Sequence, residues 1–235
     1  MPTIDEAVRY PMEGEDWLMT ILIGGVLTIF GFLIIPLLAV YGYLLRVIKR
    51  SLEKDPQPPS FGDWGDIVID GVKVAVIGIV YSIIPTIVFG VTVGGSIIAM
   101  ATGTRGGAAA GAAGLTVGFL LSVVLSLVFG YVGVAGLINF AAEDRLGAAF
   151  EVGTLSMIVL SREYAVAWLL AVAVFLVAGI VAGVLNIVPF LGAIAGAFIF
   201  FYAQIVAVNL WAGGYLDAKE SSLKNRSSMG DESTT

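Results

Sequence analysis

The longest uncharged stretch of this chain constrains its fold most strongly. Residues Tyr164 to Leu216 run for 53 positions without an Asp, Glu, Lys or Arg. The hydrocarbon core of a bilayer is about 30 Å thick and takes about 20 apolar residues for each helical crossing. A run of this length therefore predicts two crossings, and Asn186-Ile187-Val188-Pro189 near its middle predicts the turn between them. The chain is expected to be an integral membrane protein.

The composition agrees with a membrane protein and removes most catalytic chemistry. Hydrophobic residues make up 58% of the 235 residues and charged residues 13%, against about 25% charged in soluble domains. The chain has no cysteine and no histidine, which excludes thiolate nucleophiles, Cys/His metal sites and the commonest proton shuttle. We therefore predict no enzymatic activity, no catalytic, metal-binding or cofactor-binding residues, and no nucleic-acid partner.

Three further apolar runs complete the expected architecture. The fold class is predicted to be an all-α integral membrane protein, a bundle of about five transmembrane helices with one interfacial amphipathic helix. Pro36 lies inside the first expected span and predicts a kink there. Small residues around Arg105 predict an exposed hairpin turn between the second and third spans. The five spans are expected at residues 17–45, 74–101, 115–142, 164–185 and 190–213.

A short segment between the third and fourth spans has a different pattern. Its apolar residues recur at intervals of four, three, four and three positions, which is the period of one helix face. This spacing predicts an amphipathic helix lying along the membrane surface at residues 145–161. The residues on its apolar face are Leu146, Phe150, Gly153, Met157 and Leu160.

The basic residues predict the orientation. If five spans alternate sides, ten Lys and Arg residues fall on one side and only Arg9 and Arg105 on the other. The positive-inside rule then places the N-terminus outside and the C-terminus in the cytoplasm of a cell-membrane protein. The domains follow as an acidic extracellular segment at 1–16, a single transmembrane domain at 17–216 and a disordered cytoplasmic tail at 217–235. The acidic water-facing segments also predict a halophilic source.

Few polar side chains lie within the expected spans. Asn139, Gln204 and Asn209 could line a permeation path, but hydrogen bonds between helices explain them more simply. No charged residue lies inside an expected span, whereas ion-coupled transporters usually hold one. Glycines at helical spacing predict close-packed faces, within the chain or between copies, at Gly179, Gly183, Gly192 and Gly196.

A set of short motifs carries a family resemblance through its order along the chain. The motifs are Gly31 to Leu38 leading to Tyr41-Gly42-Tyr43, Phe61-Gly62-Asp63-Trp64, Ala148-Ala149-Phe150, Ser161-Arg162-Glu163-Tyr164 and Asn186 to Gly192. Together they resemble an uncharacterised family of archaeal, largely haloarchaeal, membrane proteins, catalogued as domain of unknown function four thousand and thirteen. The likeness extends from Glu6 to Ala218. It implies a multi-pass helical domain and carries no catalytic residues, because the family has no assigned activity.

Two functions remain open from the sequence. The first is a non-enzymatic membrane-organising or partner-binding bundle, whose partners are the lipid bilayer and either further copies or other membrane proteins. The alternative is a transporter or channel for a small solute, without an intramembrane charged coupling site. A water-accessible path between Asn139, Gln204 and Asn209 would favour the alternative, and a dry, close-packed interior would favour the first.

Overall fold

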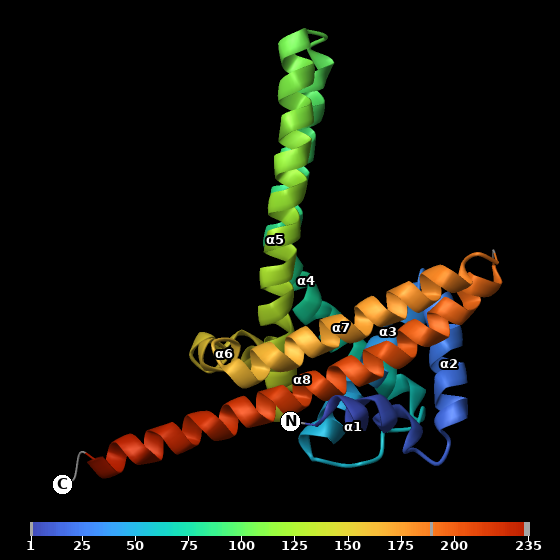
Figure 1. The fold of residues 1–235 in the computed structure, drawn as a ribbon, viewed down its shortest axis with the longest axis vertical. Coiled ribbons are helices and arrows are strands. Elements are labelled where there is room, and N and C mark those ends of the chain that lie inside the picture. The colour runs from blue at the N-terminus through green and yellow to red at the C-terminus, as the bar shows by residue number, and fades with distance from the viewer. Residues whose placement is uncertain (1, 189, 233–235) are drawn as a thin grey trace. The chain divides into compact units, whose positions relative to one another are not determined.

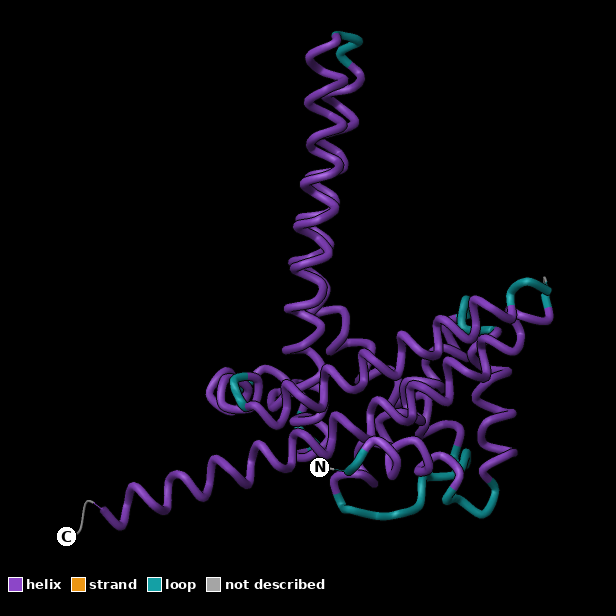
Figure 2. Tube along the Cα trace, viewed as in Figure 1, coloured by secondary structure: helices purple, strands orange, loops and turns teal. Residues whose placement is uncertain are grey.

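The computed structural model of the chain describes residues 2–188 and 190–232 and confirms the all-α fold class. It is 85% helical, and no described residue lies in a strand (Figures 1 and 2). Pro189, expected at the turn in the longest apolar run, lies outside the described residues. The elements are α1 (Ile4–Arg9), the 3-10 helix η1 (Tyr10–Met12), α2 (Trp17–Ile29), α3 (Ile34–Leu52), α4 (Trp64–Ala101), α5 (Arg105–Glu143), the 3-10 helix η2 (Leu146–Phe150), α6 (Val152–Val159), α7 (Arg162–Leu185) and α8 (Leu191–Glu232).

Four of these helices, α4, α5, α7 and α8, are long and apolar enough to cross a membrane. Helix α2 is apolar as well, but it has only 13 residues. Because each residue adds about 1.5 Å, a helix of that length covers about 20 Å of a core that is about 30 Å thick. The architecture therefore indicates a membrane protein, with four helices in place of the five spans expected.

The first expected span, residues 17–45, differs from the sequence-based prediction because it forms two helices. α2 ends at Ile29 and α3 begins at Ile34. Pro36 lies in the first turn of α3, where backbone N–H groups have no partner within the helix, so its missing N–H removes no hydrogen bond. The proline therefore stands near a helix start and does not kink a longer helix.

α2 and α3 form a hairpin whose outer ends meet. The hydroxyl of Tyr10, before α2, donates to the carbonyl oxygen of Gln57, after α3, at 3.5 Å. A Cβ built on Gly14 would lie 3.3 Å from Cγ of Pro58. The residues that precede α2 and those that follow α3 are thus neighbours, whereas a single crossing over 17–45 would have separated them by a bilayer.

The described chain divides into two compact units, where the sequence suggested a single domain. The small unit is Val76–Val134, which comprises most of α4 and α5. The large unit comprises the rest of the chain, Met1–Ala75 and Ala135–Thr235 in its full bounds. Each unit is described by itself below.

In the small unit, α4 and α5 pack against each other through glycines. A Cβ built on Gly111 would lie 2.4 Å from Cγ of Met100, and one on Gly118 would lie 2.4 Å from Cβ of Thr92. α5 begins at Arg105, ten residues before the expected start at 115, so most of the glycine-rich segment is helical and only residues 102–104 turn. Close helix packing outweighs the roughly 1 kcal/mol that each glycine costs a helix.

In the large unit, the core lies between α3 and the middle of α8. The largest fully buried side chains there include Tyr43, Leu45, Phe201, Ile205 and Tyr215. α7 runs beside α8 in the opposite direction (Figures 1 and 2). Helix α1 also joins this core, because Ala7 packs in a cluster with residues of α7 and α8. The acidic N-terminal segment is therefore part of the folded unit.

Two further expectations differ from the structure. The tail expected to be disordered is helical through Glu232, because α8 continues and its extension pairs Glu220 with Lys54 and Ser221 with Glu163; residues 233–235 lie outside the described residues. The interfacial segment 145–161 is two short helices, η2 and α6, joined at Glu151. The residues it buries are Ala148, Ala149, Leu155 and Ile158, and the apolar face predicted for it stays largely uncovered.

Candidate functional site

Buried polar contacts link four separate segments near the end of α3. The amide of Asn209 in α8 donates to the hydroxyl oxygen of Ser51 in α3 at 2.9 Å, and both side chains are buried. Tyr10 of η1 lies beside Ser51, and burial raises the pKa of its hydroxyl to about 12, so the phenol stays neutral. Its hydroxyl then reaches the Gln57 carbonyl. These contacts hold the N-terminal segment, α3, the following loop and α8 together.

A second buried group joins α5, η2 and α8. The Nδ2 group of Asn139 donates to the Ala148 carbonyl oxygen at 2.8 Å, and its Oδ1 accepts from the hydroxyl of Tyr215 at 2.6 Å. Asn139 is fully buried. Both ends of this amide are therefore satisfied by the chain itself, as an interhelical hydrogen bond requires.

The three amides singled out from the sequence have different surroundings. Asn139 bonds with Tyr215 and Ala148, whereas Asn209 bonds with Ser51. Gln204 differs, since its Oε1 is buried and has no hydrogen-bond partner among the described residues. The sequence analysis missed Tyr10, Ser51 and Tyr215, because single hydroxyl groups near helix ends carry no motif.

Charged side chains of the large unit form ion pairs around the ends of α3, α4 and α5. Arg46 lies 3.6 Å from Asp70, and Asp70 also binds Lys73 at 2.9 Å. Lys49 of α3 binds Asp144 at 2.7 Å, and this hydrogen bond with the lysine's charge lowers the pKa of that carboxyl. The Arg46–Asp70 and Lys49–Asp144 pairs connect segments that are distant in the sequence. We call this region the charged base.

The charged base has a shallow hollow of about 350 Å³ beside α3. Arg46, Lys49 and Arg50 line it together with Glu53 and Asp63. Each of these basic side chains already has an acidic partner in the structure, including Asp55 for Arg50. Among the described residues, no cluster of three or more potential metal ligands occurs. The hollow therefore presents a surface of mixed charge.

The four glycines predicted to form close-packed faces behave differently from one another. A Cβ on Gly179 or Gly183 would meet nothing within 4 Å, so these two residues face away from the described chain. A Cβ on Gly196 would make ordinary contact with Cβ of Ala182 at 3.4 Å. Gly192 approaches the backbone closely, because its Cβ would lie 2.3 Å from the Leu185 oxygen in the α7–α8 turn. Only Gly192 and Gly196 therefore pack within this chain.

A very close helix crossing uses two glycines outside the predicted set, Gly42 and Gly71. A Cβ on Gly42 of α3 would lie 1.8 Å from the Ile67 carbonyl oxygen, and one on Gly71 of α4 would lie 1.9 Å from the Leu38 oxygen. The two backbones thus touch at a crossing where only hydrogen fits. Gly71 has small-xxx-small spacing with Ala75, but Gly42 has Leu38 and Arg46 four positions away, so only one side of the crossing carries that motif.

Comparisons with known proteins give one match. No curated protein and no solved structure matches this chain. A family model described as protein of unknown function, DUF4013, matches residues 23–187. The match covers 165 of the 235 residues, from within α2 to the first residues of the α7–α8 turn. The chain therefore belongs to the DUF4013 family of proteins of unknown function.

Proposed function

We propose that this protein is a non-enzymatic membrane protein that organises the bilayer or binds partners through its helices and charged base. The observation that carries this proposal is the uncovered apolar surface of its long helices. In the most apolar 18-residue windows of α4 and α5 only 11% of the residues are buried, and in that of α7 only 17%. Such surfaces need lipid, further copies of the chain or other membrane proteins to cover them.

The hydrogen bonding of the buried amides supports a binding bundle over a solute path. A permeation path needs polar groups that face a common water-filled space. Asn139 and Asn209 instead form hydrogen bonds with separate partners within the chain. The absence of histidine and cysteine, together with the pairing of the basic side chains around the hollow, supports a non-enzymatic role.

A transporter or channel is the second candidate, and Gln204 is the residue that favours it. Its Oε1 is a buried acceptor without a partner among the described residues, and an acceptor of this kind usually binds water or a ligand. If the protein is a transporter or channel, we expect solute passage to depend on Gln204.

We propose that the charged base faces the cytoplasm and that the N-terminal segment lies on the same side. The contact of Tyr10 with Gln57 supports this placement. It differs from the outside N-terminus that five crossings predict. Arg9 then joins the other basic residues, so the count becomes eleven on one side against Arg105 alone on the other. The positive-inside asymmetry is stronger than the ten against two of the earlier count.

The acidic surface supports a proposal about the source. With 18 acidic and 12 basic residues, and the charges confined to the water-facing parts, the chain suits high salt, as a haloarchaeal source implies. The thermal unfolding temperature in detergent should rise as KCl is increased from about 0.1 M to about 2 M, because salt screens repulsion between carboxylates. A falling temperature would contradict a halophilic source.

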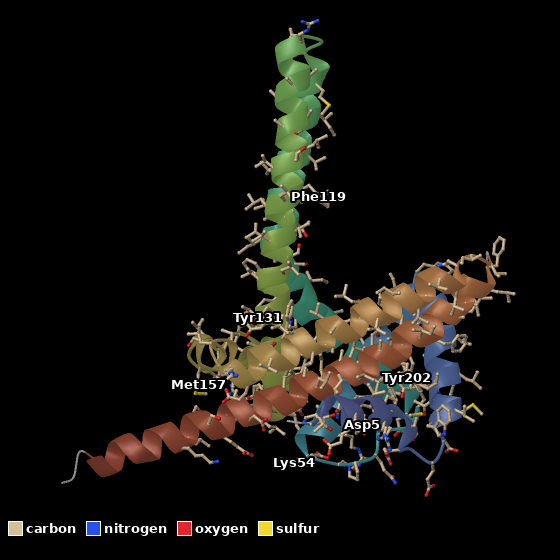
Figure 3. The ribbon with its side chains drawn as sticks, in the orientation of Figure 1. Asp5, Lys54, Phe119, Tyr131, Met157 and Tyr202 are labelled. Atoms are coloured by element: carbon tan, nitrogen blue, oxygen red, sulfur yellow. The ribbon has the colours of Figure 1, made fainter. Side chains whose placement is uncertain are left out.

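Two assays separate the candidate functions. Liposomes containing the protein should take up glycerol and urea no faster than protein-free liposomes, and protein-dependent uptake lost in Gln204→Leu would establish the transporter instead. A photo-crosslinking residue at Phe119, which projects from α5 (Figure 3), should give a discrete protein adduct in native membranes. The same probe at buried Ile138 is the control. Lipid adducts alone at Phe119 would contradict partner binding by this face.

A further inference from the structure

The helical hairpins of this chain have turns of opposite character. The turn between α4 and α5 contains Thr102 and Thr104 and is followed by Arg105. The turns of the α2–α3 and α7–α8 hairpins are uncharged, and Asn186, exposed at the start of the α7–α8 turn, is their one polar side chain among the described residues. They expose large side chains, including Phe32 at 79% and Phe190 at 84%. The large apolar side chains exposed at these two hairpin ends include Phe32, Ile34, Ile35, Ile187 and Phe190. In water, exposed apolar surfaces of this kind favour aggregation.

The backbone of both apolar turns is largely satisfied from within. In the α2–α3 turn, the N–H groups of Phe30, Gly31 and Leu33 donate to carbonyl oxygens three or four residues earlier in the helix end or turn. In the α7–α8 turn, Asn186, Ile187 and Val188 donate in the same way at 3.0 to 3.2 Å. A turn can remain in hydrocarbon only if its polar backbone groups find partners without water. These two turns meet that requirement at the donors named.

The α2–α3 hairpin is too short to cross a bilayer. α2 has 13 residues and therefore extends about 20 Å. In α3 the uncharged stretch from Ile34 to Leu45 extends about 18 Å before Arg46, which pairs with Asp70 in the charged base. Both arms thus reach about two thirds of a core that is about 30 Å thick.

The charged helix α1 limits the depth of the α7–α8 hairpin. α1 lies along α8, with the Tyr202 hydroxyl donating to the Val8 carbonyl oxygen and Pro2 packed where a Cβ on Gly213 would lie. Asp5 and Arg9 on α1 have side chains 72% and 65% exposed, and Figure 3 shows Asp5 on α1 beneath the stretch of α8 that carries Tyr202. A single charge at the centre of a membrane costs about 2.5–3.5 kcal/mol, and the pairing of Asp5 with Arg9 at 3.2 Å offsets only part of that cost, so α1 stays near water. Above Tyr202, α8 has only residues 191–201, about 17 Å of helix.

We propose that both hairpins are re-entrant. Each enters the cytoplasmic leaflet from the charged base, turns within the hydrocarbon core and returns to the same side. The acyl chains of the bilayer are the partner that covers the two apolar turns. α7 is long enough to cross by itself, so its hairpin enters obliquely, with α1 along α8 and the exposed side of α7 toward lipid. The α4–α5 hairpin, whose segments 76–101 and 105–134 extend about 39 and 45 Å, then makes the two complete crossings.

Side-specific labelling of single cysteines tests the proposal, and the chain has no native cysteine to interfere. A membrane-impermeant maleimide should label Thr104→Cys in intact cells and Asp5→Cys only in inverted vesicles. Phe32→Cys and Ile187→Cys should be protected in both preparations and should become labelled once detergent removes the bilayer. All four positions are exposed, so the substitutions leave the core intact.

Each contrary result would overturn one part of the proposal. Labelling of Ile187→Cys in intact cells, as for Thr104→Cys, would make the α7–α8 hairpin a complete crossing. Labelling of Asp5→Cys in intact cells would place the N-terminus outside. Labelling of either turn in inverted vesicles would put that turn in water, and protection that persists in detergent would mean that protein, not lipid, covers it. None of these outcomes depends on whether the protein organises membranes or passes solutes.

Discussion

The α4–α5 and α7–α8 hairpins are built from equally apolar helices, yet they solve different packing problems. In the small unit, α5 brings Gly111, Gly114 and Gly118 against α4, and the turn between the helices is polar. In the large unit, Gly179 and Gly183 of α7 face open space, while the close approach lies at the turn, at Gly192. Its turn is apolar.

The difference teaches that the length of an apolar run does not establish a crossing. The 53-residue run of α7 and α8 satisfies the length criterion for two spans. What distinguishes it from α4 and α5 is the chemistry of its turn and the charged helix packed along α8. The following predictions test this contrast, beginning with the largest effect.

The largest loss is expected from Gly42→Leu in the large unit. The added Cβ would lie 1.8 Å from a backbone oxygen, and no side-chain rotamer can relieve a clash with backbone. The loss should exceed the roughly 1–3 kcal/mol that overpacking usually costs, so little folded protein should survive gel filtration in detergent. Gly78→Leu in the small unit, where a Cβ meets nothing within 4 Å, is the matched control. Equal behaviour of the two variants would disprove the α3–α4 contact.

A charge in the apolar turn is expected to have the next largest effect. Ile187→Lys should make the free energy of insertion into lipid nanodiscs less favourable by up to about 2.5–3.5 kcal/mol, because the turn lies in hydrocarbon. Thr104→Lys in the polar turn should be neutral. In detergent micelles the difference between the two variants should shrink. If Ile187→Lys were as stable as Thr104→Lys in nanodiscs, the α7–α8 turn would have to lie in water.

Glycine packing should matter in one hairpin and not in the other. Gly118→Leu should destabilise the small unit by about 1–3 kcal/mol, because its Cβ would lie 2.4 Å from Thr92. Gly183→Leu, in open space on α7, should leave the unfolding temperature in detergent unchanged. A loss at Gly183 under conditions where the protein is self-associated would instead identify α7 as a contact between copies.

The smallest expected effect is a pH dependence of stability that arises from the Lys49–Asp144 pair of the charged base. The Lys49 hydrogen bond and charge hold the pKa of Asp144 below its ordinary value of 3.8. The stability that this pair contributes is present above that value and is lost as the pH falls through the lower pKa of the folded state. Asp144→Asn and Lys49→Met should each flatten the decline in unfolding temperature as the pH falls below 3.8. An unchanged decline in both would rule out the pair as its source.

Much of the helical architecture could be predicted from hydropathy, since lipid-exposed spans must be long and apolar. The break at residues 30–33 could not, because Phe30, Phe32 and Leu33 keep the run apolar and only Gly31 hints at a turn. The start of α5 was placed too late, because glycine lowers helix propensity locally while packing against α4 reverses its effect.

The buried polar groups were predictable in part. Asn139 and Asn209 were found because amides are rare within apolar helices, but their partners come from segments far away in sequence. The contact of Tyr10 with Gln57 could not be predicted, because the positive-inside count over five expected spans puts the N-terminal segment on the opposite side of the membrane. Only tertiary contacts could reveal that it packs into the core.

A disulfide between the two ends of the α2–α3 hairpin tests the central claim most directly. With Gly14→Cys and Pro58→Cys in one chain, mild oxidation of native membranes should give an intramolecular disulfide, because a Cβ at Gly14 lies 3.3 Å from the Pro58 side chain. Each single variant is the control for bonds between copies. Failure to form the bond, together with labelling of Gly14→Cys from outside and Pro58→Cys from inside, would show that residues 17–45 cross the membrane and would contradict the account.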